Sequence, residues 1–504
     1  MARVAVVGAG LGGLAAAARL VSLGHAVTVL EQAPAVGGKL GWYVRDGHGF
    51  DTGPSLVTLP QVYRDLFAAT GARLEDAVDL VRLDPAVAYR FADGTPLLVP
   101  GTRQEVPDAV DAALGPGTGA QWAALLARAG AMWRVTEQPF LRSPLAGAAT
   151  LARLARSASD VATVAPWRTL RGLGAEHLRH PALRTLLDRY ATYSGSDPRR
   201  APAVLATVPY VEQEYGSWYV RGGLRRLAEA VAARAVERGA VVRTGALVER
   251  VLVEGGRAAG VRLADGEVLG ADVVVSGADA AALYADLLPS SRATGRVRRD
   301  LARSTPSLSG FVLLLALRGR TPGLAHHTVL FPEDYDAEFD AVFGVGRHRG
   351  APRPVADPTV YVSAPDDPAT RPDGADESWF VLVNAPRHRA GHDPAGGVDW
   401  DAPGLADRYA QQVLEVMARR GLDVRDRLRW CVVRTPADLA RETRSVGGSI
   451  YGTSSNGARA AFLRPGNASP VPGLFLVGGS AHPGGGLPLV ALSAQIVAGL
   501  VGPA

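Results

Sequence analysis

The sequence predicts an α/β protein in which one domain is built on a parallel sheet and a mixed α+β domain is inserted into it. Three observations support this prediction. The chain opens with an apolar strand, a glycine turn and an apolar helix over residues 3–24. It closes with the same three elements over residues 474–502. Between these ends the sequence changes character more than once, and 504 residues are enough for two or more domains.

The first strand and turn have the order of a dinucleotide-binding unit. Residues 3–7 are rich in valine, which predicts a buried parallel strand. The sequence GAGLGG at residues 8–13 contains the pattern G-x-G-x-x-G, and an alanine-rich helix is expected over residues 14–24. A second strand over residues 25–31 ends in Glu31. This order predicts a Rossmann-type domain that binds a dinucleotide.

Each part of this unit has a physical task. Gly8 allows the tight turn, Gly10 lets the backbone approach a pyrophosphate, and Gly13 lets the helix pack closely on the strand. The start of the helix offers free N–H groups and the positive end of the helix dipole to the phosphates. The carboxylate of Glu31 is placed to accept hydrogen bonds from ribose hydroxyls.

The stretch after the second strand favours FAD over NAD. An NAD domain would continue into a further helix and strand, whereas residues 32–57 form a glycine-rich excursion, QAPAVGGKLGWYVRDGHGFDTGPSLV. Its turn at Gly38-Lys39 offers backbone N–H groups and the chain's only lysine to a second anionic part of the cofactor. An ordinary surface loop is the alternative interpretation of that turn.

Several motifs resemble a known family. EQAPAVGGKLG at residues 31–41 and GFDTGPSLV at residues 49–57 are similar to the amine-oxidase-like flavoproteins, and HPGGGLP at residues 482–488 is more specific to carotenoid desaturases of the phytoene desaturase type. The resemblance covers most of the chain. The stretch RYATYSGSDPRRAPAVLATVPYVE at residues 189–212, with that ending, resembles one branch, the 3,4-desaturases of acyclic 1-hydroxylated carotenoids.

The resemblance implies an amine-oxidase-like flavoprotein fold, in which a mixed α+β substrate domain is inserted into a Rossmann-type FAD-binding domain. We expect a discontinuous FAD-binding domain from residues 1–58, 204–304 and 441–504. A substrate-binding, membrane-facing domain would comprise residues 59–203, expected to be helical, and residues 305–440, where strands alternate with loops rich in proline and aspartate.

The glycine turn near the C-terminus has its own role in this fold. Residues 474–479 predict a buried strand, and the helix expected over residues 487–500 is apolar on nearly every side, so its start should be buried. A buried helix start needs an acceptor for its free N–H groups. The resemblance implies that the N1–C2=O edge of the flavin is this acceptor, while the first turn holds the pyrophosphate. The residues expected to contact non-covalently bound FAD are Gly8, Gly10, Leu11, Gly12, Gly13, Glu31, Gln32, Gly38, Lys39, Gly53, Pro54, Ser55, Val248, Gly478, Gly479, Ser480, Leu489 and Val490.

The implied reaction is the desaturation of a carotenoid. A hydride passes from an allylic carbon to flavin N5, and the neighbouring proton passes to a base or to water. Because the positive charge spreads along the polyene, the site needs an apolar tunnel more than catalytic side chains. Oxygen or a quinone would then accept the electrons.

No catalytic residue is assigned by the sequence. His482, in the second turn, is either a polar contact to flavin or substrate or a hydrogen-bonded structural histidine. Phytoene desaturases often carry an acid shortly after Pro-Phe-Leu, but PFLRSPLAG at residues 139–147 has none. Asp197, Glu212 and Glu214 are the substitutes considered.

Three alternative functions remain open. A carotenoid isomerase would use reduced FAD on the same scaffold without net oxidation. An amine oxidase or a protoporphyrinogen oxidase fits the ending HPGGGLP less well. A carrier of carotenoids or prenylated proteins would use the fold for binding only, and loss of the two glycine turns would indicate it; both turns are intact.

The amino-acid composition excludes several classes of binding partner and site. Aromatic residues make up only 6% of the chain and the net charge is a modest +5, so no nucleic-acid partner is expected. The single cysteine, Cys431, cannot form an internal disulfide and is expected to be a buried, inert thiol in a cytoplasmic protein. His326 and His327 are expected to be structural, and no metal site is expected.

We expect peripheral attachment to the inner face of the cell membrane, since a carotenoid must be collected from a bilayer and no stretch of the chain is expected to span one. Residues 140–174 have few acids and several arginines, so they could lie in the headgroup region with the arginines toward anionic lipid. An ordinary packed helix of the substrate domain is the alternative. The side chains concerned are Arg142, Arg153, Arg156, Arg168 and Arg171, with Leu151, Leu154, Trp167, Leu170 and Leu173.

Overall fold

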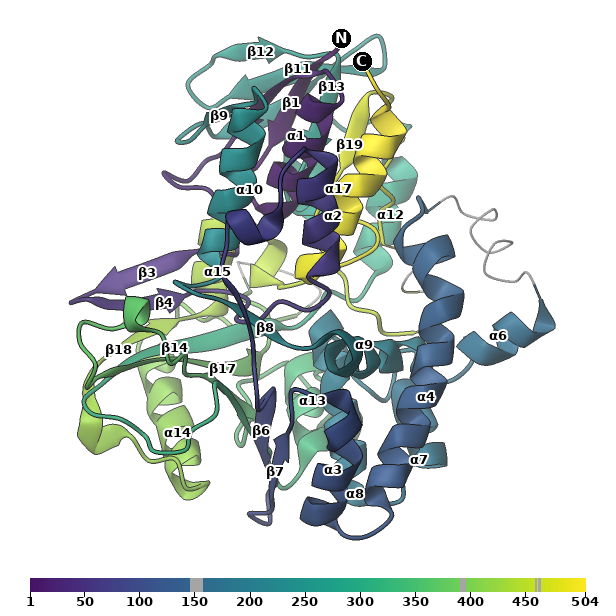
Figure 1. The fold of residues 1–504 in the computed structure, drawn as a ribbon. Helices are drawn as coiled ribbons and strands as arrows, with labels where there is room; N and C mark the ends of the chain where they lie inside the picture. Colours follow the sequence, from purple (N-terminus) through teal and green to yellow (C-terminus); the bar gives the residue numbers. More distant parts are fainter. Residues whose placement is uncertain (146–156, 390–395, 458–459, 461–463) are drawn as a thin grey trace.

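The fold has two halves, one around a parallel sheet and one around a larger mixed sheet (Figure 1). The computed structural model describes the whole chain except residues 146–156, 390–395, 458–459 and 461–463. Both ends of the chain lie at the top of the first half in Figure 1. The glycine turns at the two ends of the sequence therefore belong to the same half.

The parallel sheet has the strand order β19-β13-β1-β2-β9. Its central strands are runs of valine that are buried on both faces, as expected for a parallel sheet covered on both sides. Helices α1, α2, α10 and α17 cover one face, and the three-stranded sheet β10-β11-β12 covers the other. The bounds are β1 Arg3–Val7, β2 Ala26–Leu30, β9 Val241–Arg243, β10 Val248–Glu254, β11 Arg257–Leu263, β12 Val268–Gly270, β13 Val273–Ser276, β19 Leu474–Leu476, α1 Leu11–Ser22, α2 Gln61–Ala69, α10 Arg225–Glu237 and α17 Leu487–Val501.

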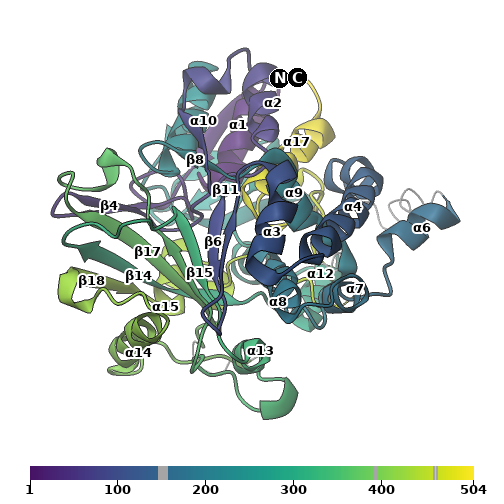
Figure 2. The same cartoon turned by 60° about the horizontal axis from the view of Figure 1, so that its bottom comes forward.

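The mixed sheet has the order β18-β14-β17-β16-β15-β6-β7, and only β15 and β6 are parallel neighbours in it. Side chains alternate along β14, so Phe311 and Leu313 pack toward α14 while Val312 lies on the opposite face. Figure 2 shows α14 beneath the strands of this sheet. The bounds are β6 Val87–Arg90, β7 Pro96–Val99, β14 Ser309–Leu317, β15 His327–Leu330, β16 Val360–Ser363, β17 Glu377–Ala385, β18 Leu428–Arg434 and α14 Leu405–Arg419.

Helices lie beside the mixed sheet and form the other wall of this half (Figure 2). The longest, α4, buries Trp122, Leu125, Leu126 and Ala129, the spacing of one helix face. It continues into a π-helical turn, Glu137–Leu141. Besides α14, the described helices of this half are α3 Val106–Leu114, α4 Thr118–Thr136, α6 Ala158–Val164, α7 Leu170–His177, α8 Pro181–Arg189, α9 Thr207–Tyr215 and α13 Tyr335–Phe343. Further elements of the chain are β3 Trp42–Arg45, β4 His48–Asp51, β5 Leu80–Arg82, β8 Trp218–Val220, α11 Ala280–Ala282, α12 Gly295–Arg303 and α15 Pro436–Thr443.

The strands divide between the two main sheets as the predicted segments do, but two helices lie across the predicted boundaries. Helix α2, expected in the substrate domain, packs against α1 and α17 of the first half. Helix α9, expected in the FAD-binding domain, packs against α4. Each helix lies where its apolar face finds a partner, which a boundary drawn from composition does not capture.

Residues 59–203 are mostly helical, as expected, but this expectation missed strands β5, β6 and β7, which lie in the same stretch. Strands β6 and β7 form a hairpin whose turn contains Gly94 at a φ of 86°. Tyr89 and Phe91 beside it stack on Phe331, a residue distant in sequence. Such short strands depend on tertiary packing more than on local propensity.

Candidate active site

One cavity of about 910 Å³ joins the two halves. Both glycine turns border it, and every residue that the sequence predicts to contact FAD lies in its wall. The rest of the wall is mostly apolar and comes from the helices and from the inner face of the mixed sheet. Apolar members of the wall are Trp133, Phe140, Leu141, Val161, Val164, Leu205, Val208, Val211, Val312, Phe380 and Leu382.

The first turn leaves space where a pyrophosphate would lie. Helix α1 begins after Gly10, which provides no side-chain cap, so its first N–H groups are available to a ligand. A Cβ atom built on Gly10 would have nothing within 4 Å. On Gly13 it would lie 2.2 Å from the carbonyl oxygen of Gly8, so only glycine allows helix and strand to pack this closely.

Glu31 closes the first turn. Its side chain is buried, and its two oxygens accept the N–H groups of Ala9 at 2.7 Å and Ala33 at 2.8 Å. These bonds fix the carboxylate at the edge of the cavity. A carboxylate has about four acceptor sites, so lone pairs remain for ribose hydroxyls.

Lys39 forms hydrogen bonds within the protein that the sequence does not predict. Its Nζ donates to the carbonyl oxygens of Ser449 at 3.1 Å and Ile450 at 2.6 Å. Burial lowers the pKa of Lys39, and the carboxylate of Asp279 opposes that shift. Only one of the three ammonium N–H donors is left for an anionic group of the cofactor.

The second turn is in direct contact with the first. A Cβ atom on Gly12 would lie 3.0 Å from the Cα of Gly478, so the two backbones meet there. Helix α17 begins after Gly486, again without a side-chain cap. Its start therefore offers N–H groups to the same cavity, at the place expected for the flavin ring.

A buried arginine that the sequence analysis did not single out holds this second turn. The Arg464 guanidinium donates to the carbonyl oxygens of Tyr451 at 2.9 Å, Thr453 at 2.6 Å and Gly479 at 2.6 Å. Burial lowers the pKa of Arg464 to about 10, so it stays protonated at neutral pH. The stretch FLRPGNAS contains the only sequence signal, a lone arginine in a short segment before a buried strand.

His482 lies outside the cavity wall that the structure describes. Its side chain is fully buried, and its Nε2 lies 2.9 Å from the carbonyl oxygen of Phe140 and 3.0 Å from that of Ser143. Carbonyl oxygens only accept, so Nε2 carries the proton. These contacts tie the second turn to the π-helical turn and favour the structural alternative over contact with flavin or substrate.

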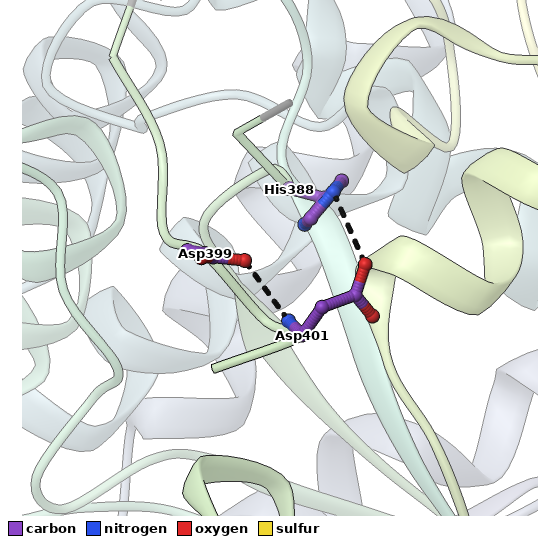
Figure 3. Close-up of side chains that lie close together, drawn as sticks. All are labelled: His388, Asp399 and Asp401. Atoms are coloured by element: carbon purple, nitrogen blue, oxygen red, sulfur yellow. Dashed lines mark hydrogen bonds and ion pairs between the residues drawn. The ribbon is translucent and has the colours of Figure 1, made fainter. Parts of the chain in front are cut away.

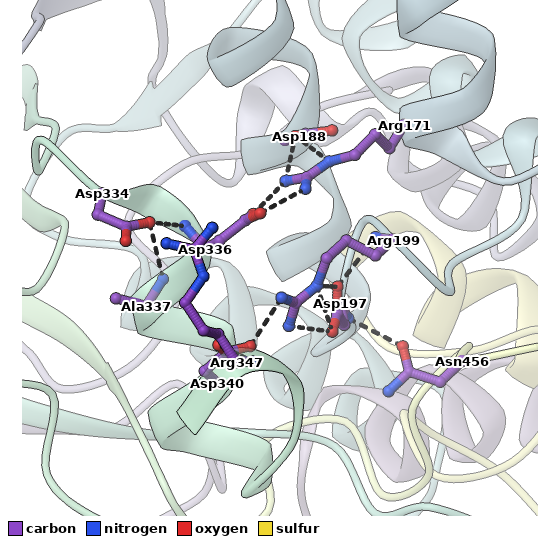
Figure 4. A network of polar contacts seen from close by, with 10 residues as sticks. All are labelled: Arg171, Asp188, Asp197, Arg199, Asp334, Asp336, Ala337, Asp340, Arg347 and Asn456. Carbon is purple, nitrogen blue, oxygen red and sulfur yellow. Dashed lines mark hydrogen bonds and ion pairs between the residues drawn. The ribbon is translucent and has the colours of Figure 1, made fainter. Parts of the chain in front are cut away.

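The three candidate carboxylates have different environments. Asp197 is held by Arg199 at 2.8 Å within a buried network (Figure 4), and Glu214 pairs with Arg103. Glu212 is 5% exposed and lies in the cavity wall. Of the three, Glu212 alone borders the space where a substrate would lie.

Of the two adjacent histidines, which are expected to be structural, His327 is buried and His326 is half-buried. Burial lowers the pKa of His326 to about 4 and holds the pKa of His327 well below its usual range, so both are neutral. Nδ1 of His327 lies 2.6 Å from the hydroxyl of Tyr361. Cys431 is partly exposed rather than fully buried, but burial of its thiol raises the pKa to about 11, so it is unreactive.

Among the described residues, one surface group brings a histidine and two carboxylates together: His388, Asp399 and Asp401 (Figure 3). Asp401 already pairs with Arg441 at 3.0 Å, and Asp399 accepts the backbone N–H of Asp401. Protein contacts therefore account for this cluster, which lies apart from the cavity.

The predicted membrane-facing segment is partly corrected. Leu170 and Leu173 are buried in α7, so they do not face lipid. Arg171 pairs with Asp188 and Asp336 (Figure 4). Trp167 is 65% exposed, and Arg168 pairs with Glu176. Leu151, Arg153, Leu154 and Arg156 lie outside the described residues. Across the described part of the chain, none of the helices combines the length and apolarity needed to cross a bilayer.

Comparison with known proteins agrees with this geometry. The chain is 34% identical to the 4,4'-diapolycopene oxygenase of Methylomonas sp (98% of this chain, 97% of the relative) and 35% identical to the hydroxyneurosporene desaturase of Rubrivivax gelatinosus (98% and 92%). It is 33% identical to the zeta-carotene-forming phytoene desaturase of Myxococcus xanthus (98% and 93%).

The fold recurs in solved structures. Cyclohexylamine oxidase from Brevibacterium oxydans IH-35A matches with a TM-score of 0.62 and 16% identity, over 99% of this chain and 98% of that one. The family model of flavin-containing amine oxidoreductases matches residues 11–377. The chain therefore belongs to the flavin-containing amine oxidoreductase family as an FAD-dependent oxidoreductase similar to its carotenoid desaturases and oxygenases.

Proposed function

We propose that this chain is a carotenoid desaturase that introduces C=C bonds into an acyclic carotenoid. The observation that supports this best is that one cavity of about 910 Å³ is bordered at one part by both glycine turns and elsewhere mostly by apolar side chains. A polyene needs such an apolar wall along its length, and the reacting carbons must come close to the cofactor. The names of the relatives agree with this substrate class.

The protein's own contribution is binding, orientation and exclusion of water. Bound FAD supplies a hydride acceptor at the flavin ring. The start of α17 would favour negative charge at the ring edge that it faces. The mostly apolar wall limits access of water to the polyene, along which the positive charge left by hydride removal is delocalised until a base or a water molecule takes the neighbouring proton.

A second candidate function is oxygenation of the carotenoid end, since one relative at 34% identity is named a diapolycopene oxygenase. Polar side chains in the cavity wall, among them Arg189 and Glu212, would also fit an oxygenated product. An isomerase on the same scaffold would change neither mass nor oxidation state.

Feeding acyclic carotenoids to a producing host that expresses the chain separates these functions. A desaturase gives products lighter by two hydrogens, with absorption shifted to longer wavelength. A product that contains added oxygen, as an alcohol (one oxygen gained) or as a carbonyl (one oxygen gained and two hydrogens lost), would assign an oxygenase, and a product of unchanged mass an isomerase. Repeating the reaction without air, with and without an added quinone, identifies the electron acceptor as oxygen or a quinone.

We also propose that the protein binds the inner face of the cell membrane through the region of α6. Val161 and Val164 of α6 lie in the cavity wall, and Trp167, which follows this helix, is exposed. Helix α6 lies at the side of the molecule in Figure 1. A water-insoluble substrate could pass from lipid to the cavity here.

Co-sedimentation with anionic liposomes at low salt tests this attachment. A variant with Trp167→Ala, Arg153→Glu and Arg156→Glu should stay in the supernatant, while the wild type sediments and is released as salt rises. The matched control is Arg250→Glu with Arg257→Glu, in the paired strands β10 and β11, of which β11 is labelled at the top of Figure 1; it should sediment like the wild type. Equal sedimentation of all three proteins would rule out this dock.

A further inference from the structure

Glu212 differs from the other carboxylates of the cavity wall. In the described part of the wall these are Glu31, Glu212, Asp279, Asp286 and Glu442. Backbone N–H groups donate to Glu31 and Asp279. Glu442 pairs with an arginine, and Asp286 is exposed. Glu212 is 5% exposed and belongs to α9 in the helical wall, so it is a buried carboxylate that borders the substrate space.

Helix α9 has one side in the cavity wall. Val208, Val211 and Glu212 all lie in this wall, and positions three and four residues apart share one side of a helix. Glu214, two positions farther along, is exposed and pairs with an arginine. Because two valines lie on the same side as Glu212, its carboxylate is placed beside hydrocarbon rather than in open solvent.

Two tyrosine hydroxyls donate to Glu212. Its oxygens accept from Tyr190 at 2.7 Å and from Tyr193 at 3.1 Å. Burial raises the pKa of both tyrosines well above its usual range, so both hydroxyls keep their protons. Hydrogen bonds that a carboxylate accepts favour its ionised form. A carboxylate has about four acceptor sites, so lone pairs remain on both oxygens of Glu212 for a proton.

A buried cation lies close to Glu212 without pairing with it directly. Arg189 is 7% exposed, and its Nη1 donates to the hydroxyl of Tyr193 at 3.1 Å, the same hydroxyl that donates to Glu212. A nearby positive charge offsets part of the cost of burying a carboxylate. No arginine or lysine among the described residues forms an ion pair with Glu212, and a direct pair would make a carboxylate a weaker base.

Glu212 also lies near the loop that is predicted to contact FAD. The hydroxyl of Tyr361 is 2.5 Å from Oγ of Ser55 in that loop. Burial raises the pKa of Tyr361, and the smaller influences on this pKa include the charges of Arg189 and Glu212. Tyr361 therefore connects the predicted cofactor loop with the surroundings of Glu212.

The second glycine turn lies near the same group of side chains. A Cβ atom on Gly485 would lie 2.3 Å from the ring of Tyr451, so this ring packs directly against the turn. Burial raises the pKa of Tyr451 to about 12, and the charge of Arg189 opposes that shift. Arg189 and Glu212 therefore lie on the side of the cavity where the flavin ring is expected, which is where the reacting carbons must come.

We propose that the Glu212 carboxylate is the base that takes the proton during desaturation, an inference that rests on the proposed function. One C–H bond breaks and its electron pair leaves as hydride to FAD. The C–H bond of the neighbouring carbon then breaks, its electron pair forms the new C=C bond, and its proton protonates Glu212. The substrate loses two electrons and FAD gains them. Reoxidation of the reduced cofactor by oxygen or a quinone consumes the hydride and one proton, so Glu212 is ionised again for the next turnover.

The first test compares Glu212→Gln with the wild type, both loaded with FAD and given one acyclic carotenoid. An amide keeps the size of the side chain but is not a base, so the turnover per bound flavin should fall by about 10²-fold or more. Carotenoid affinity should stay near the wild-type value; it is read from quenching of tryptophan fluorescence, since Trp133 lies in the cavity wall. The matched control is Glu214→Gln on the same helix, which should keep the wild-type turnover.

Two further measurements separate a base from a structural residue. With deuterium on the carbon that loses the proton, the isotope effect on turnover should be larger in Glu212→Gln than in the wild type, because proton removal becomes the slow step. Glu212→Ala should regain turnover per bound flavin when formate, a small carboxylate, is added. Both readings are taken per bound flavin, so they hold even where a variant retains less FAD.

The opposing outcomes are distinct. Wild-type turnover in Glu212→Gln would assign the proton to water or to another base, and would leave the proposed function standing. A fall in turnover with an unchanged isotope effect and no rescue by formate would make Glu212 a structural residue. A wild-type protein that forms no double bond in any acyclic carotenoid would contradict the proposed function, and this assignment with it.

Discussion

The two glycine turns carry out related tasks with different construction. The first, at residues 8–13, depends on the absence of side chains, since the space beside Gly10 is open. Among the contacts described above, Glu31 supplies the one side-chain hydrogen bond to this turn, from the N–H of Ala9. The second, at residues 478–486, is held from outside by buried side chains such as Arg464 and Asn467. A lesion in the first turn should therefore remove the cofactor and spare the fold, whereas a lesion at the second should loosen the fold as well.

The largest effect is expected from Gly10→Val. The new side chain meets no protein atom within 4 Å at its Cβ, so the chain should fold, but it would fill the space expected for the pyrophosphate. The purified variant should contain no flavin by absorbance, while circular dichroism stays native. Gly374→Val, at another glycine with open surroundings, is the control and should keep its flavin. Stoichiometric flavin in Gly10→Val would refute the placement of the pyrophosphate.

The substitution with the next largest expected effect, Arg464→Met, tests how far the second turn depends on a buried side chain for its stability. It leaves three buried carbonyl oxygens without their donor, which should lower the free energy of unfolding by about 3 kcal/mol or more and weaken flavin retention together. Thermal melting with and without added FAD measures both. If the variant loses flavin while its melting temperature stays at the wild-type value, the second turn, like the first, contributes to cofactor binding and not to the stability of the fold.

A smaller loss, in FAD affinity, is expected from Glu31→Gln. An amide keeps the shape of the side chain but replaces charge-assisted hydrogen bonds to ribose, which are worth about 1.5–3 kcal/mol, or roughly 10- to 150-fold in the FAD dissociation constant. The variant should fold, because the contact to the Ala33 N–H needs only an oxygen. Glu267→Gln, at an exposed ion pair, is the control. An unchanged dissociation constant would remove Glu31 from the cofactor site.

The contrast between the turns also explains what the sequence could predict. The first turn and Glu31 lie within 31 contiguous residues, so spacing alone defines their geometry. The strand, the glycines and the apolar helix of the second turn are evident in the sequence, but the role of Arg464 is not, because its acceptors Tyr451, Thr453 and Gly479 are separated from it in sequence. All predicted FAD contacts border the cavity, and contact of each with FAD itself stays a prediction.

The substrate side was harder to predict, because its contacts join distant segments. Tyr361 meets Ser55 across 306 residues, and no spacing rule reveals such a pair. Glu212 and Glu214 are two positions apart on α9, which places them on different sides of the helix, and only packing decides which side faces the cavity. Leu170 and Leu173 share the core-facing side of α7, so the packed-helix alternative, rather than the lipid-facing one, was correct for them.

The smallest effect is expected from His482→Asn, which separates a structural histidine from a catalytic one. Asparagine is too short to replace the Nε2–H donor to Phe140 and Ser143, so the tie between the second turn and the π-helical turn should weaken by about 1 kcal/mol. The flavin spectrum and the turnover per bound flavin should stay at wild-type values, because the side chain lies outside the described cavity wall. A general acid or base would behave in the opposite way: its loss typically lowers kcat by 10²-fold or more at unchanged stability. Urea unfolding of the FAD-loaded variant, together with its turnover, distinguishes the two outcomes. A fall in turnover without a fall in the free energy of unfolding would show that His482 takes part in catalysis.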